Sequence, residues 1–229
     1  TRGMGGFWPV PDGATVVANQ YERFESGAFN DTPILVGTNS NEGDLFVTQP
    51  ITGEGFEKMI RSRYPSGAEE LLRAYPYATD EEATQSAKDI MRDSAFAWPT
   101  WAWATLQSKA GKNKAFVYYF DHRTPRSPNG ANHAAEISYV FRNLGKMGAS
   151  DGPEDKALSE LISSYWVNFA KNGDPNGAGL PEWPPFEEKE QLVMFMDGET
   201  GSRKHPNLEK IMAFDAYFDK VREEGKAKE

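Results

Sequence analysis

The sequence predicts an α/β fold in which a mostly parallel sheet is flanked by helices. Segments typical of strands and of helices alternate along the 229 residues, as they do in layered α/β proteins. The run 33–37, PILVG, is continuously apolar, which is typical of a parallel strand covered on both faces. The run 114–122, KAFVYYFDH, predicts a second strand of the same kind.

Helices are expected on either side of these strands. After the first strand, the pattern is helical at 55–64 and 68–75. A long helix follows from Thr79 or Asp80, where a capping residue precedes acidic first-turn residues. Pro99 is expected to break or kink that helix, because proline lacks the backbone N–H that a helix interior needs.

The second half of the chain continues the alternation. Residues 154–173 form an amphipathic helical pattern that Gly173 closes. The run 191–197, QLVMFMD, predicts a third strand, and 207–224 predicts a last helix. The terminal stretch 222–229, REEGKAKE, has the charged composition of a disordered tail.

Composition excludes several classes of function. The formal net charge is −9 and the Lys and Arg residues form no basic cluster, which argues against nucleic-acid binding. With no cysteine there is no disulfide, thiolate nucleophile or zinc–thiolate site. No apolar run approaches the ~20 residues of a membrane helix. Thr1 opens the chain without a signal-peptide pattern, so we expect a processed product or a segment that lacks upstream residues; secreted, periplasmic and cytoplasmic locations all stay open.

Two side chains in the loops after strands are candidates for chemistry. In α/β sheets the loops that follow the C-terminal ends of strands carry the functional residues, and Glu42 and His133 both lie in such loops. A histidine that acts as a general base needs a carboxylate on its other ring nitrogen, so Glu42 is a candidate to orient His133. A structural His133 and a solvated Glu42 remain the alternatives. Of the other histidines, His122 is expected in a structural salt bridge and His205 on the surface.

Four motifs resemble those of one family in the same order. Residues 37–46, GTNSNEGDLF, resemble the acid motif of type-B carboxylesterases, the cholinesterase-like branch of the α/β-hydrolases. Residues 130–141, GANHAAEISYVF, resemble the histidine motif of that family. The late helix with its Trp-Pro loop, WVNFAKNGDPN and WPPF, and the early stretch FWPVPDG are similar as well.

This resemblance implies a fold, a reaction and roles for four residues. The fold is the C-terminal half of an α/β-hydrolase, and the reaction is ester hydrolysis through an acyl-enzyme on a Ser-His-Glu triad. Glu42 corresponds to the acid and His133 to the base. Glu136, at the acidic position after the histidine, and Asn41, which replaces a common Asp, are expected to support the loops. Ala134 replaces the Gly that commonly follows the histidine, which puts the loop backbone in question.

The nucleophile of the family is absent from the chain. The one Gly-x-Ser-x-Gly match, GASDG at 148–152, has no predicted strand before it, as a nucleophile turn of this family requires; no His-Gly-Gly-Gly loop occurs, and GMGGF at 3–7 is interpreted as a linker. The resemblance therefore implies that residues 1–229 are the C-terminal segment of one catalytic domain, and that an N-terminal portion of the same esterase carries the serine. No metal or cofactor is expected, and the substrate is a small ester. A cholinesterase-like interaction domain without activity is the alternative.

Aromatic residues supply candidates for a substrate pocket. Phe46 ends the acid motif, and Trp98 and Trp101 belong to the WPTWAWA stretch of the long helix. The competing interpretation is that aromatic residues at helical spacing belong to the core.

Overall fold

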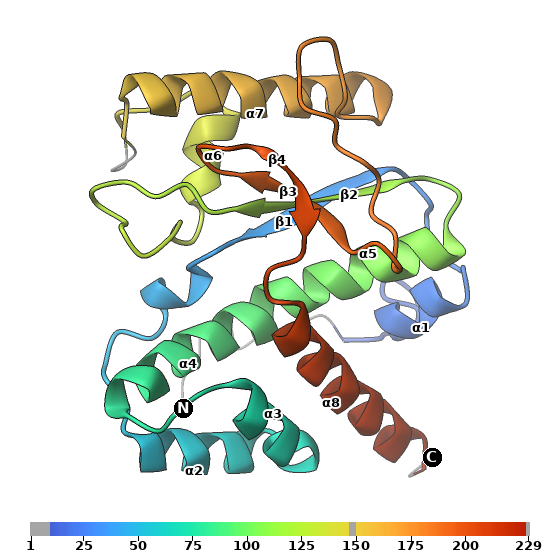
Figure 1. Cartoon of the computed structure of the whole chain (residues 1–229). Coiled ribbons are helices and arrows are strands. Elements are labelled where there is room, and N and C mark those ends of the chain that lie inside the picture. The colour runs from blue at the N-terminus through green and yellow to red at the C-terminus, as the bar shows by residue number, and fades with distance from the viewer. Residues whose placement is uncertain (1–9, 147–149, 228–229) are drawn as a thin grey trace.

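The structure, a computed structural model, describes residues 10–146 and 150–227, and within them the chain forms a four-stranded sheet. Helices lie on both faces of this sheet (Figure 1). The predicted α/β class is therefore confirmed. The expected linker at 3–7 lies outside the described residues.

The sheet is mostly parallel, in the order β1-β2-β3-β4. Strands β1 (Ile34–Asn39), β2 (Ala115–Phe120) and β3 (Leu192–Met196) run parallel, and β4 (Gly201–Lys204) pairs antiparallel with β3. Because β1 and β2 pair along their whole lengths, from 34↔115 to 39↔120, they end at the same edge of the sheet. The loops that leave these two strands therefore meet.

Strand β1 is the outer strand of the described sheet, although its sequence is that of an inner one. It pairs with β2 on one side, and among residues 10–146 and 150–227 no strand pairs with its other side. Its apolar side chains Leu35 and Val36 are only half-buried. A long apolar edge of this kind is normally covered in a folded protein.

The helices account for most of the remaining chain, and none of those described is long and apolar enough to cross a membrane. The segments are α1 (Gln20–Glu25), η1 (Glu42–Leu45), α2 (Gly53–Arg63), η2 (Pro65–Gly67), α3 (Ala68–Ala74), α4 (Asp80–Arg92), η3 (Asp93–Ala97), α5 (Trp98–Ala110), α6 (Ala135–Val140), α7 (Pro153–Asn172) and α8 (Leu208–Lys226).

Three apolar clusters hold these elements together. On β2, Val117 and Tyr119 face α5, whereas Phe116 and Phe120 face α7, so both faces of this strand are buried. This two-sided burial explains why the run is continuously apolar. The third cluster joins α2, α3 and α4 to Phe214 of α8, away from the sheet.

The long helix changes its geometry just before the proline. Thr79 caps α4 in a capping box with Glu82, as the sequence indicates. The five residues of η3 then form a π-helix, and α5 begins at Trp98 with Pro99 in its first turn. Pro99 has no N–H to donate to the preceding turn, so it interrupts the α-helical hydrogen bonds there without ending the helical segment.

The C-terminal tail is more ordered than the sequence suggests. Disorder is expected from residue 222, but α8 continues to Lys226. Arg222 stacks over the ring of Tyr21, with its Cζ atom 3.8 Å from the ring centroid. This contact ties the last turns of α8 to α1, which composition alone does not reveal. Residues 228–229 lie outside the described part of the chain.

Candidate active site

Glu42 lies directly after β1, at the first position of η1. Its carboxylate turns back toward the strand, where the backbone N–H of Asn39 donates to Oε1 at 2.9 Å. Gly43 allows this turn to pack against α4, because a Cβ at residue 43 would stand 2.0 Å from the carbonyl oxygen of Lys88. The glycine that follows the acid in the motif is thus required by a close backbone contact.

His133 comes from the loop after β2, which is bonded to the Glu42 turn. The backbone N–H of Ala131 donates to Ser40 Oγ at 2.8 Å, and the N–H of Asn41 donates to the carbonyl of Ala131 at 2.9 Å. Gly130 permits this approach with a φ of 137°, since a Cβ there would meet Ser40 Oγ at 2.6 Å. The two loops therefore meet as neighbouring parts of one site.

The structure brings the two candidate side chains together. Glu42 Oε2 lies 2.5 Å from His133 Nδ1. The Glu42 side chain is 7% exposed and the His133 side chain 37%. Nε2 of His133 has no hydrogen-bond partner within the described ranges. With Nδ1–H donating to the carboxylate, Nε2 carries the lone pair and can accept a proton from a nucleophile.

Burial raises the pKa of the Glu42 carboxyl. The hydrogen bond from Asn39 N–H and the contact with His133 oppose this effect but do not cancel it. A desolvated carboxylate interacts more strongly with a positive charge than an exposed one does, because the local dielectric is low. Glu42 is therefore suited to stabilise the imidazolium that forms when His133 accepts a proton.

Two phenylalanine rings flank the imidazole. The ring of Phe46 lies 5.5 Å from that of His133 and the ring of Phe96 lies 5.1 Å from it. Phe46, a predicted pocket residue, thus lies at the site. Phe96 was not predicted. It belongs to the π-helix η3, and Pro99, three residues later, is the sequence feature that marks an irregular helix here.

Glu136 and Asn41 both bond to the loops around the pair. Asn41 Nδ2 donates to Asn132 Oδ1 at 3.2 Å. Glu136 accepts a hydrogen bond from Asn39 Nδ2 at 2.5 Å, and Asn39 Nδ2 also donates to the carbonyl of Asn132 at 2.8 Å. Asn39, which the sequence analysis missed, therefore contacts Glu42 through its backbone and the His133 loop through its side chain.

Comparisons with known proteins identify the family of the chain. A sequence model described as the carboxylesterase family matches residues 1–214. The chain belongs to the carboxylesterase family. It is 30% identical to the para-nitrobenzyl esterase of Bacillus subtilis (strain 168), over 89% of this chain and 42% of that protein. It is 29% identical to the bile salt-activated lipase of Homo sapiens, over 86% of this chain and 30% of that protein.

Solved structures show the same relationship. A PNB esterase structure superposes with a TM-score of 0.75 and 29% identity, covering 91% of this chain and 43% of that one. A thermophilic PNB esterase gives a TM-score of 0.71 and 28% identity, with 84% and 40% coverage. The fold is thus part of an α/β-hydrolase fold. The chain spans well under half the length of these relatives.

Ala134 shows how this member of the carboxylesterase family accommodates its departure from the motif. Its backbone has φ 64° and ψ 11°, the left-handed conformation that glycine adopts readily. The loop thus keeps a glycine-type turn although a Cβ is present, at a cost of about 1 kcal/mol. The turn starts α6 directly after His133.

Trp98 and Trp101, predicted to line a substrate pocket, make their contacts with α8 and with the loop before β3. Trp98 stacks on Phe218 of α8 with ring centroids 3.9 Å apart, and its Nε1 donates to Asp215. Trp101 is 5% exposed and donates to Gln191 Oε1 at 2.8 Å. The core interpretation holds for both, because their spacing turns them toward α8 and the loop before β3.

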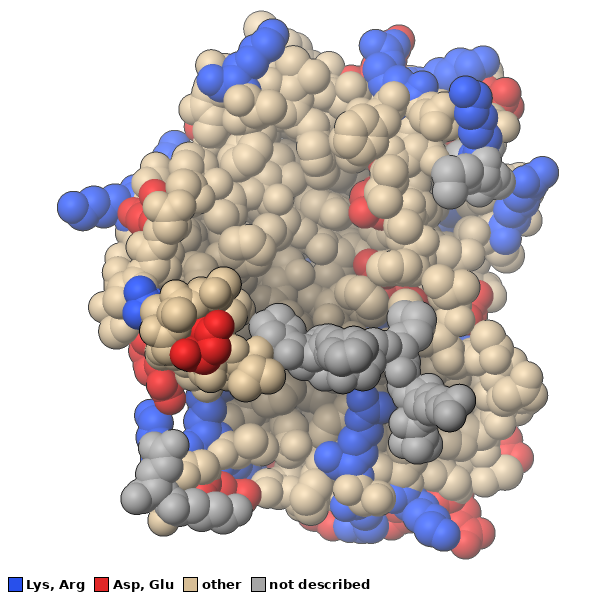
Figure 2. Space-filling model, turned by 180° about the vertical axis from the view of Figure 1, so that it is seen from behind, with Lys and Arg blue, Asp and Glu red and all other residues tan. Residues whose placement is uncertain are grey.

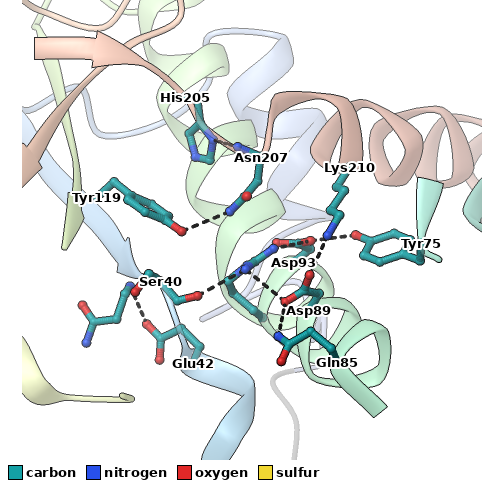
Figure 3. A network of polar contacts seen from close by, with 12 residues as sticks. Ser40, Glu42, Tyr75, Gln85, Asp89, Asp93, Tyr119, His205, Asn207 and Lys210 are labelled. Atoms are coloured by element: carbon teal, nitrogen blue, oxygen red, sulfur yellow. Dashed lines mark hydrogen bonds and ion pairs between the residues drawn. The ribbon is translucent and has the colours of Figure 1, made fainter. Parts of the chain in front are cut away.

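The other two histidines have structural environments. His122 Nε2 lies 2.9 Å from Asp155 Oδ1, which also accepts from Tyr139 Oη at 2.6 Å. His122 does contact a carboxylate, but this is Asp155 of α7 and not a sequence neighbour. His205 is not on the surface as expected: it is 7% exposed, packs edge-on against Tyr119 and accepts a hydrogen bond from the Asn207 N–H (Figure 3).

His205 makes the stability of the fold sensitive to acid. Its pKa is lowered from 6.5 to about 4 because burial and the nearby charge of Arg92 disfavour the imidazolium. Unfolding therefore takes up a proton below pH 6.5, and the stabilisation present above that pH is lost as the pH falls toward 4. We expect this histidine alone to lower the free energy of unfolding by about 2 kcal/mol between pH 7 and pH 4.5.

Urea unfolding of wild type and His205→Asn at both pH values measures this contribution. Asparagine at residue 205 keeps a hydrogen-bond acceptor but does not titrate. The loss of stability on acidification is expected to be about 2 kcal/mol smaller in the variant. An identical loss in both proteins would mean that His205 is not the group responsible.

The described residues offer no evident metal site. No group of three or more His, Asp or Glu side chains within residues 10–146 and 150–227 is arranged to hold an ion.

Proposed function

We propose that this chain supplies the acid and the base of a Ser-His-Glu triad in an enzyme that hydrolyses carboxylic esters. The observation that carries the proposal is the 2.5 Å contact between Glu42 and His133, with Nε2 of the imidazole left open. Membership of the carboxylesterase family supports ester hydrolysis in general. An interaction domain without activity gives no role to a buried carboxylate bonded to a partly exposed imidazole.

Each residue has a defined step in the reaction. A serine hydroxyl attacks the ester carbonyl, and Nε2 of His133 takes the hydroxyl proton. Glu42 holds the ring by its Nδ1–H and stabilises the imidazolium. His133 then returns the proton to the departing alcohol, which leaves an acyl-serine. Water attacks the acyl group with His133 again as base, and the serine is regenerated with release of the acid.

We further propose that the serine and the oxyanion donors lie in an N-terminal portion of the same esterase. The one Gly-x-Ser-x-Gly match in the sequence, GASDG at 148–152, comes between α6 and α7 and not after a described strand, so it lacks the strand-turn-helix context of a nucleophile. This supports the proposal, as does the outer position of the apolar strand β1. Figure 2 shows a face that is hollowed at its centre and mostly uncharged there, with charged side chains around it. The N-terminal portion would add a strand to β1 and cover apolar surface, through an interface well above ~2,000 Å².

The test is ester hydrolysis by residues 1–229 alone and after assembly with the N-terminal portion. A chromogenic acyl ester is the substrate. The chain alone is expected to show no turnover above background, because it lacks the group that forms the acyl-enzyme, and assembly is expected to produce turnover. A monodisperse isolated chain that hydrolyses the ester would contradict the proposal.

A further inference from the structure

Arg92 is a buried charged residue outside the Glu42–His133 pair. It ends α4 and is 6% exposed. Its guanidinium donates two hydrogen bonds to Asp93, from Nε at 2.7 Å and from Nη2 at 3.0 Å. Nη1 donates to Asp89 at 3.3 Å and to the backbone carbonyl of Ser40 at 3.2 Å. Ser40 is two residues before Glu42.

Ser40 is the point where three parts of the molecule meet. Its N–H donates to the carbonyl of Phe120 at the end of β2. Its Oγ accepts from the N–H of Ala131 in the His133 loop, and its carbonyl accepts from Arg92. The position of Ser40 therefore determines how the turn that carries Glu42 lies against β2 and against the loop that carries His133.

The two carboxylates bonded to Arg92 have further partners: Asp93 lies beside Tyr75, and Asp89 beside Lys210 (Figure 3). Asp93 is fully buried and also accepts from Tyr75 Oη at 2.7 Å. Asp89 accepts from Lys210 Nζ at 2.5 Å. Arg92 and Lys210 are thus paired with Asp89 and Asp93. The bonds to these two carboxylates lie outside the Glu42–His133 pair and fix the orientation of the planar guanidinium.

We propose that Arg92 is a positioning residue for the Glu42–His133 pair, which it serves by holding the Ser40 carbonyl and with it the turn that carries Glu42. This inference rests on the proposed function. The rigid, planar guanidinium can donate two hydrogen bonds to Asp93 and one to Ser40 at the same time. An ammonium group has the same charge but no such rigid set of donors. Misplacement of a catalytic group by ~1 Å can cost about 100-fold in rate, so a small shift of the turn is sufficient to matter.

The test compares Arg92→Lys with Lys210→Met in the assembled enzyme. Arg92→Lys keeps the positive charge beside Asp89 and Asp93 but loses the planar guanidinium that bonds to Asp93 and Ser40 together. We expect kcat to fall about 10- to 100-fold while KM stays within about 2-fold, because the substrate contacts are untouched. Lys210→Met removes a cation from the same cluster without touching Ser40, so kcat is expected to change by less than about 2-fold even where stability falls. Equal kcat losses in the two variants, or none in Arg92→Lys, would overturn the proposal.

Two additions keep the result decisive. If Arg92→Lys does not fold, the double variant Arg92→Gln with Asp93→Asn removes one charge of each sign and is expected to show the same loss of kcat. The NMR resonance of the proton between His133 Nδ1 and Glu42 reports the geometry without any turnover. We expect it to broaden or shift in Arg92→Lys and to persist in Lys210→Met. If the assembled protein hydrolyses no ester but the resonance changes in Arg92→Lys, the positioning role is supported and the proposed function is contradicted. If the enzyme is active and Arg92→Lys changes neither the resonance nor kcat, the positioning role alone is contradicted.

Discussion

Replacement of His133 by alanine is expected to lower kcat for ester hydrolysis by about 10⁴-fold or more in the assembled enzyme. In the proposed mechanism the imidazole of His133 takes the serine proton and returns it to the leaving alcohol. Alanine leaves the serine un-ionised and the alcohol unprotonated, and the remaining catalysis comes from substrate binding and oxyanion donors. The measurement is kcat and KM with a chromogenic ester, at saturating substrate.

His122 provides the matched control. It too is an imidazole that follows β2 and bonds to a carboxylate, Asp155, at 2.9 Å. His122→Ala is expected to weaken the packing of α6 and α7 while kcat of the folded protein stays within a few-fold of wild type. If His133→Ala is no slower than His122→Ala, His133 is not the base.

Glu42→Gln is expected to lower kcat by about 10³- to 10⁴-fold, because it reverses the tautomer of the histidine. Asn39 N–H donates to one oxygen of Glu42 and therefore keeps the amide oxygen of a glutamine on its side. The amide NH₂ then faces His133 Nδ1, which must accept from it, so the ring proton moves to Nε2. A ring protonated at Nε2 has no lone pair there for the serine proton.

Asp155→Asn is the corresponding control, since Asp155 is the carboxylate of the other histidine pair. It is expected to reduce stability but to leave kcat within a few-fold of wild type. A Glu42→Gln enzyme with nearly normal kcat would show that the carboxylate charge and the tautomer are unimportant, and the triad assignment would fail.

The parts of the site that the sequence predicts are those fixed by local rules. Glu42 and His133 are candidates because each follows a predicted strand, and the resemblance of the surrounding residues to the type-B carboxylesterase motifs implies their roles as acid and base. Gly43 follows the acid in the motif, and the structure explains it, because a Cβ there would collide with the backbone carbonyl of Lys88. The strands and the motif residues are recognised from short runs of neighbouring residues, whereas the meeting of the two loops depends on the pairing of β1 with β2.

The features that the sequence did not predict depend on contacts between distant segments. Arg92 is one of several charged residues in α4, and its bond to Ser40 exists only because α4 packs on the acid turn. His205 has polar neighbours in sequence but is enclosed by Tyr119 and Asn207 in space. The sequence allows Trp98 to be either a pocket residue or a core residue, and the position of α8 shows that its ring packs on Phe218. Composition carries no information on which face of a helix meets which partner.

The central claim is that this chain activates a serine that it does not contain. The most direct measurement is reaction of the assembled enzyme with a fluorophosphonate, followed by mass spectrometry to locate the adduct. We predict a single serine adduct outside residues 1–229, formed at a rate that His133→Ala reduces by several orders of magnitude. An adduct on a serine within residues 1–229, or labelling that does not depend on His133, would contradict the account.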